Sequence, residues 1–272
     1  MHRLRTLSVT KMMMLLTASG FIVTLAFAGP LVSELLRERQ KLKVDATLTS
    51  LASMIGNLTH ELQKERGASA GYISSSGSSF ADILPRQRKA SDEAIARFVQ
   101  EADVAESLLP PESAVVEQLT NVRTKIAQLG ELRQDIDMLQ TEVSTAAGTI
   151  TALNQTAISV LPALGKEIGF ANAARAVQRH AILMTAKDIA GLERAAGAAG
   201  FAQAATNGGG IPEAIVDRLN TRAQEQDVLL RIYREVASAR LAEALTSFVD
   251  SPVLENVIAL RNIANSGDAA AI

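Results

Sequence analysis

The sequence predicts an all-α protein in which an N-terminal transmembrane helix leads into a region of long helices. Apolar residues make up 47% of the chain and aromatic residues only 3%, so the apolar content is mainly Ala, Leu, Ile and Val. Abundant Ala and Leu favour helices. No segment combines alternating apolar residues, β-branched side chains and hairpin turns, which are the signals of strands. The third observation is an uncharged apolar run near the N-terminus, at 12–33.

Residues 12–33 have the length and composition of a membrane-spanning helix. The run contains no ionisable side chain and matches the roughly 20 residues that cross a bilayer. Arg3, Arg5 and Lys11 precede it, and the positive-inside rule then places residues 1–11 in the cytoplasm. We therefore expect a protein of the inner (cytoplasmic) membrane whose domain after residue 33 lies in the periplasm.

A cleaved signal peptide is the competing interpretation of the same run. Ala26-Phe27-Ala28 has the A-x-A form of a cleavage site, and the basic start suits a signal peptide. The apolar run continues past this point and is longer than the usual hydrophobic region of about 7–15 residues. Its length favours an uncleaved anchor.

Turn-forming residues divide the rest of the chain into helices. The Ser- and Gly-rich stretch 74–79, Pro110-Pro111 and the glycines after Asn207 predict breaks, and Gly148 marks a further turn. Ser251-Pro252 has the cap-and-start pattern of a last helix. The expected helices cover 35–74, 86–99, 112–139, 149–205 with a bend at Pro162, 212–245 and 252–263.

The third of these helices carries a regular apolar stripe. Its residues recur at spacings of three and four from Val115 to Leu139. This spacing is typical of an amphipathic helix packed on one side, or of a short coiled-coil seam. The seam supports an alternative function for the external part, as a helical dimerisation or protein-interaction module with no small-molecule ligand.

Composition and motifs speak against catalysis and cofactors. The chain has no cysteine, and its three histidines are too scattered to form a metal site. Glu61, Glu65, Asp188 and Glu193 can be posed as acid–base pairs, but no nucleophile or cofactor fingerprint accompanies them. We expect no enzyme, no metal and no cofactor. The net charge of −2 gives no bias toward nucleic acid, so we expect no nucleic-acid partner.

The most informative stretch surrounds Arg66. On a helix this residue falls four positions after Leu62, beside the apolar stripe, and its guanidinium stays charged at biological pH. Small residues follow at once, among them Gly67 and Ser69. Small side chains allow a close helix approach or leave a hollow beside the charge. Glu65 precedes the arginine and is a candidate to hold its guanidinium in position.

A second stretch repeats this order of features. Glu193 and Arg194 are again followed by small residues, including Gly197. Two matched segments suggest two halves that face one another, with both arginines directed into one shared space. In the simpler alternative, each arginine is a surface residue or part of a structural salt bridge, the glutamates pair with neighbouring lysines or solvent, and the small residues mark a tight helix crossing.

Three motifs carry a resemblance to a known family. His60–Tyr72, the run Arg86-Gln87-Arg88-x-x-Ser91-Asp92, and Lys187–Ala195 resemble the signatures of the NIT domain, the nitrate- and nitrite-sensing domain of bacterial receptors. The resemblance implies two four-helix bundles and a ligand site at Arg66 and Arg194. It also implies a cytoplasmic output in the same protein, such as a methyl-accepting chemotaxis module, a kinase or a cyclase.

The resemblance completes the functional hypothesis. A guanidinium offers a planar fork of donors to two oxygens at once, and two such forks can hold nitrate or nitrite between them. We expect a sensor domain at 34–265 that signals across the membrane to chemotaxis as a homodimer. The tail at 266–272 stops before a second membrane pass and output module, so we expect the chain to be the front part of a receptor.

Overall fold

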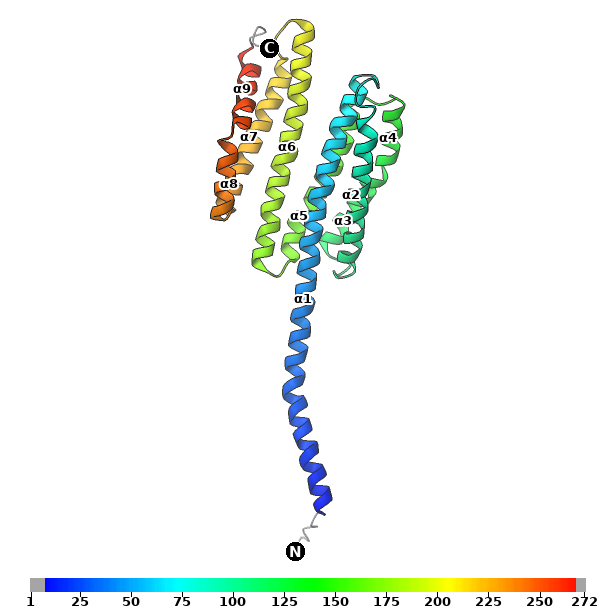
Figure 1. Cartoon of the computed structure of the whole chain (residues 1–272), viewed down its shortest axis with the longest axis vertical. Helices are drawn as coiled ribbons and strands as arrows, with labels where there is room; N and C mark the ends of the chain where they lie inside the picture. Colours follow the sequence, from blue (N-terminus) through cyan, green and yellow to red (C-terminus); the bar gives the residue numbers. More distant parts are fainter. Residues whose placement is uncertain (1–7, 268–272) are drawn as a thin grey trace. The chain divides into compact units, whose positions relative to one another are not determined.

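The computed structural model describes residues 8–267, and these contain helices and no strand (Figure 1). The predicted all-helical class is confirmed. Residues 1–7 and 268–272 lie outside the description, and with them Arg3, Arg5 and most of the predicted tail. The helices are α1 Val9–Ser74, α2 Ile83–Glu106, α3 Ala114–Ala127, α4 Leu129–Asp137, α5 Val143–Glu167, α6 Ala171–Asn207, α7 Glu213–Val236, α8 Ala239–Val249 and α9 Pro252–Ser266.

The chain divides into two compact units, Met1–Ala46 and Thr47–Ile272. Within the described part of the first unit, α1 exposes large apolar side chains such as Met13, Leu16 and Phe27. Among the described residues, α1 is the one helix long and apolar enough to cross a membrane, judged by length and composition alone. The transmembrane helix at 12–33 therefore stays a prediction.

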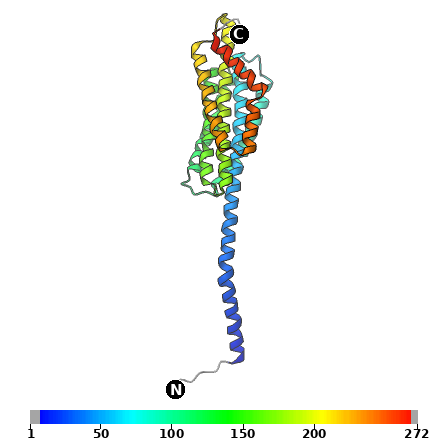
Figure 2. The same cartoon turned by 90° about the vertical axis from the view of Figure 1, so that its left-hand side faces the viewer.

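In the second unit, α1 is hydrogen-bonded to α2, α4 and α5, and α3 packs against these same three helices, so that α1 to α5 form a first helical bundle (Figure 1, Figure 2). Leu51, Ile55, Leu58 and Leu62 recur along one face of α1 and are completely buried. Burying a leucine contributes about 1.5–3 kcal/mol, so this stripe is a main source of the bundle's stability. It ends beside Arg66.

The apolar seam of the predicted third helix lies inside this bundle. Val115, Leu119, Val122 and Ile136 are completely buried against the neighbouring helices. Most of the seam is therefore occupied within the chain, and of its apolar residues only Leu139, at its end, is largely exposed. This removes the observation that favoured a helical interaction module.

Several predicted boundaries are wrong because a helical apolar pattern continues across a break in the backbone. Gly148 lies inside α5, and the turn comes earlier, where Leu139 adopts a left-handed conformation with φ 53°. The expected helix 149–205 is two helices, because Ile168 takes an extended conformation and buries its side chain between them. Pro162, expected to bend the helix, lies within α5.

Other boundaries follow the predicted capping signals. Ser113 accepts a hydrogen bond from the backbone of Val115 and so caps α3. Gly208 ends α6 in the left-handed conformation, with φ 63°, which glycine adopts without steric cost. Pro252 occupies the first turn of α9, as expected.

Helices α6, α7, α8 and α9 form the second bundle, which has smaller core residues than the first. Its buried cluster consists of Ala204, Ile211, Leu219 and Ala264. The largest completely buried side chains of the described residues lie elsewhere, on α1 to α5. Two bundles are thus confirmed, but the first has five described helices and not four, because the predicted third helix is divided into α3 and α4. The two bundles are also packed to different degrees.

Candidate anion site

Arg66 projects from α1 into the space between α1, α5 and α6. The residue is only 6% exposed. Its Nη1 donates to the hydroxyl of Thr151 on α5 at 2.8 Å and to Oδ1 of Asp188 on α6 at 3.2 Å. No hydrogen bond joins its Nε or Nη2 to another residue within 8–267. The guanidinium is therefore fixed at Nη1, and its other two nitrogens have no hydrogen-bond partner among the described residues.

Gly191 makes room for this guanidinium. A Cβ atom at Gly191 would lie 2.7 Å from Nη2 of Arg66, closer than real Cβ contacts allow. Gly191 is one helical turn before Arg194 on α6. The absence of a side chain thus lets Arg66 contact the surface of α6 directly beside the second arginine.

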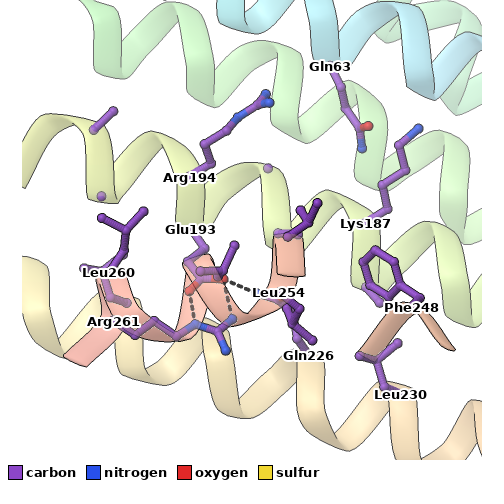
Figure 3. A pocket seen from close by; sticks show the side chains of 18 of the residues that line it. Gln63, Lys187, Glu193, Arg194, Gln226, Leu230, Phe248, Leu254, Leu260 and Arg261 are labelled. Carbon is purple, nitrogen blue, oxygen red and sulfur yellow. Dashed lines mark hydrogen bonds and ion pairs between the residues drawn. The ribbon is translucent and has the colours of Figure 1, made fainter. Parts of the chain in front are cut away.

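Arg194 has a different environment, although it lies close to Arg66. It is exposed and has no hydrogen bond or ion pair with any described residue. Figure 3 shows its side chain on the same side of α6 as Lys187 and Gln63. Burial lowers the pKa of Arg66, the charge of Asp188 opposes this effect, and the positive charge of Arg194 lowers the pKa further. The two guanidinium groups therefore lie near enough to repel each other.

Glu65 does not hold Arg66. It is completely buried and accepts two hydrogen bonds from Arg133 on α4, at 2.7 Å from Nε and 2.9 Å from Nη2. Burial alone would lower the pKa of Arg133, but the hydrogen bonds and charges of Glu65 and Asp92 together raise it. The pair fixes α1 to α4 within the first bundle.

Glu193 makes the equivalent pair in the second bundle. Its carboxylate accepts from Nε and Nη2 of Arg261 on α9, at 2.5 Å and 2.8 Å, and from Gln226 on α7. Burial would raise the pKa of Glu193, but the hydrogen bonds from Arg261 and Gln226 and the charge of Arg261 together lower it. In both bundles the arginine lies 68 residues after its glutamate. The repeat seen in the sequence therefore extends to a shared structural pair.

The small residues near the arginines differ in their roles. Gly67 is exposed, and nothing lies within 4 Å of a Cβ placed on it, so it permits no close approach. Ser69 is buried, and its hydroxyl has no partner among the described residues. Gly197 lines a cavity and would place a Cβ 3.7 Å from Leu219. Gly191, which sequence reasoning did not single out, is the glycine that contacts Arg66.

A cavity of about 780 Å³ lies within the second bundle and against α1. Apolar side chains such as Leu230, Leu254 and Leu260 line most of it, as Figure 3 shows. Its polar border toward α1 carries Lys187 and Arg194. The candidate anion site is defined as Arg66, Thr151, Asp188, Gly191 and Arg194, and it shares Gly191 and Arg194 with the lining of this cavity.

The predicted motif on α2 has structural contacts and lies outside the candidate anion site. Gln87 donates to the backbone oxygen and the carboxylate of Glu61 on α1, at 3.0 Å and 2.8 Å. Arg88 binds Asp137, and Asp92 binds Arg133. These contacts fix α2 to α1 and α4, which accounts for the charged residues of the motif.

The described residues contain no group of three His, Cys, Asp or Glu side chains arranged to hold a metal ion. The chemistry available at the candidate anion site is hydrogen-bond donation to an anion. Its donors are two guanidinium groups and the nearby ammonium group of Lys187.

Comparison with known proteins decides the family. The nitrate and nitrite sensing (NIT) family matches residues 57–271. The chain belongs to the NIT family. The resemblance read from the three motifs is therefore confirmed, and the match extends over both bundles.

Two relatives of this NIT-family chain are longer than the chain itself. The nitrate regulatory protein of Klebsiella oxytoca is 26% identical over 224 residues, which are 82% of this chain and 56% of the relative. The solved structure of the NasR transcription antiterminator has a TM-score of 0.75 at 24% identity and covers 86% of this chain and 63% of that one. The chain therefore spans little more than half the length of the curated relative, and the structural likeness shows the shared fold.

These relatives overturn the receptor context predicted from the sequence. They are a nitrate regulatory protein and a transcription antiterminator, and neither is a chemotaxis receptor. The predictions of a transmembrane chemotaxis receptor, of a periplasmic sensor and of a location in the inner membrane are therefore wrong. An apolar run near the N-terminus with positive flanking charge also occurs in signal sequences, so it is weak evidence for a membrane span.

The predicted partners need the same correction. The expectation of no nucleic acid rested on a net charge near zero, yet the solved relative is an antiterminator of transcription. The net charge of one NIT region says nothing about the function of the longer proteins in which the family occurs. The predicted membrane partner belongs to the same receptor hypothesis and is wrong with it, whereas the homodimer stays a prediction.

Sequence reasoning missed the residues that position the arginines. Thr151, Gly191 and Arg133 contact the two signatures only because α5, α6 and α4 lie beside α1. Asp188 stood inside a quoted motif and was considered only as a candidate acid or base. The equal spacing of Glu65 to Arg133 and Glu193 to Arg261 was the available signal.

Proposed function

We propose that this chain is the nitrate- and nitrite-sensing region of a regulatory protein and that it binds the anion between Arg66 and Arg194. The observation that carries the proposal is the pairing of a buried guanidinium with an exposed one that has no counter-ion among the described residues. Two neighbouring positive charges with unused donors form a site that favours a small anion.

The chemistry of the site suits a weak, reversible sensor. Nitrate and nitrite oxygens accept hydrogen bonds, and each charge-assisted bond contributes about 1.5–3 kcal/mol. About four such bonds would give roughly 6–12 kcal/mol before the costs of desolvation and of fixing the ligand. Affinities in the micromolar to millimolar range are the expected result.

Binding and not catalysis is the proposed activity. Arg66 and Thr151 belong to the first bundle and Arg194 belongs to the second, so an anion that contacts both arginines bridges two packed groups of helices. A ligand shifts a conformational equilibrium by binding one arrangement better than another. We propose that this bridging changes the packing of α1 against α6.

The names of the relatives favour an output that acts on gene expression. One relative is a nitrate regulatory protein and the other a transcription antiterminator. We propose that the longer protein uses nitrate or nitrite binding to control such an output. The part of the relatives beyond the matched region would supply that activity.

Calorimetric titration of the chain with sodium nitrate and sodium nitrite, at constant ionic strength with chloride, tests the site. Arg194→Ala should weaken nitrate binding at least tenfold. A tenfold change in Kd corresponds to about 1.4 kcal/mol of binding free energy, and a charge-assisted hydrogen bond contributes more than this. Arg97→Ala on α2 removes another exposed arginine and is the matched control. Equal binding by the parent and Arg194→Ala would contradict the proposed site.

A further inference from the structure

Asp188 is the negative charge of the candidate anion site. It lies on α6, is 3% exposed, and faces Arg66 of α1. One carboxylate atom, Oδ1, accepts from Nη1 of Arg66 and from Nε2 of Gln63, both at 3.2 Å. The same type of oxygen acceptor that nitrate would offer is therefore already present on Arg66.

Asp188 is held less tightly than the other buried carboxylates of the two signatures. Glu65 uses both oxygens on Arg133 at 2.7 Å and 2.9 Å, and Glu193 uses both on Arg261. Hydrogen bonds between an arginine and a carboxylate are usually about 2.7–2.9 Å long. The single, longer contact of Asp188 suits a group that can be displaced.

The buried guanidinium explains why such a group is needed. A buried charge without a counter-ion is strongly destabilising. Asp188 is the only ion-pair partner of Arg66 among residues 8–267. It supplies the neutralising charge when no ligand is present, whereas a bound anion can supply the same charge.

We propose that Asp188 is an internal counter-ion that competes with the bound anion for Arg66 and thereby sets the anion concentration to which the protein responds. This inference rests on the proposed function, because it assumes that the anion binds at Arg66. Displacing Asp188 would also release a contact between α1 and α6. The competition would thus couple ligand binding to the packing of these two helices.

Isothermal titration of the full chain with sodium nitrate, at constant ionic strength, tests the competition. Asp188→Asn keeps the size and an acceptor oxygen but removes the charge. It should bind nitrate about tenfold more tightly, because a neighbouring like charge is worth about one pK unit or more. Asp188→Glu keeps the charge on a longer side chain and should bind no more tightly than the parent.

Two controls separate charge from other effects. Thr151→Val removes the other partner of Nη1 without changing charge, so equal tightening in this variant would overturn the proposal. Asp103→Asn changes the net charge equally at an exposed site on α2 and should leave the affinity unchanged. If the parent fails to bind nitrate, the proposed function fails. If the parent binds and Asp188→Asn binds no more tightly, only this inference fails.

Thermal melting keeps the test decisive when the variant is unstable. Asp188→Asn should melt below the parent in chloride, because Arg66 has lost its counter-ion. Nitrate should then raise its melting temperature more than it raises that of the parent, since the anion replaces the missing charge. An equal or smaller rise, or a variant that stays unfolded in nitrate, would overturn the proposal.

Discussion

At the scale of single residues, Arg66 and Arg194 carry the same charge in opposite environments. Arg66 is buried and neutralised by Asp188, whereas Arg194 is exposed and has no partner among the described residues. The apolar stripe predicted that Arg66 lies beside the core. Asp188, Thr151 and Gly191 could not be assigned from the sequence, because their roles depend on which helices are neighbours.

Gly191 should be needed for binding and dispensable for folding. Gly191→Ala would place a Cβ 2.7 Å from Nη2 of Arg66, so the flexible guanidinium must move away. Alanine also stabilises a helix by about 0.5–1 kcal/mol relative to glycine. We therefore expect nitrate affinity to fall about tenfold, through loss of a charge-assisted bond, while the melting temperature is kept or raised.

Titration calorimetry and thermal melting measure the two effects of this change. Gly130→Ala is the matched control, because nothing lies within 4 Å of a Cβ at that position in α4. It should gain helix stability and bind nitrate as the parent does. Unchanged affinity in Gly191→Ala would show that Arg66 does not need this contact.

The buried His180 should make the stability of the chain depend on pH. Burial lowers its pKa, the charge of Lys187 lowers it further, and a hydrogen bond with Ala52 opposes both. The unfolded chain therefore binds a proton on His180 at a higher pH than the folded chain does. Stability should be kept above about pH 6.5, the usual histidine value, and should fall as the pH drops below it.

Urea unfolding of the chain at about pH 7.5 and about pH 5.5 measures this loss. His180→Gln should reduce the difference between the two values. It should not abolish the difference, because the pKa of His60 is also lowered, chiefly by burial. If the free energy of unfolding of His180→Gln differs between the two pH values as much as that of the parent, groups other than His180 cause the pH dependence.

At the scale of helices, the buried pairs Glu65–Arg133 and Glu193–Arg261 hold each bundle together beside its signature arginine. The helices could be predicted from apolar spacing and from capping residues such as Ser113. The break between α5 and α6 could not be predicted, because Ile168 continues the apolar pattern while its backbone is extended. Periodicity shows which face is buried and does not show where the backbone turns.

Arg133 and Arg123 offer a matched comparison within the first bundle. Arg133→Met should destabilise the chain by about 3 kcal/mol, because it leaves Glu65 as a buried charge without its main partner. Arg123→Met breaks ion pairs with Asp103 and Glu106 that are partly exposed, and should cost less than about 1 kcal/mol. Urea denaturation followed by circular dichroism provides both values. Equal losses would remove the special role of the buried pair.

At the scale of the whole molecule, the candidate anion site joins two bundles of the same unit. Arg66 and Thr151 come from the first bundle, and Asp188, Gly191 and Arg194 come from the second. The matched signatures predicted two related halves, but the unequal packing of their cores depends on side chains throughout α1 to α9. A ligand that contacts both halves is placed to change how they pack.

A crystal structure of the chain grown with sodium nitrate tests the central claim most directly. The account predicts one nitrate ion within hydrogen-bond distance of the guanidinium groups of both Arg66 and Arg194, beside Gly191. It also predicts that Asp188 no longer contacts Nη1 of Arg66. A nitrate ion bound elsewhere, touching neither arginine, would contradict the account.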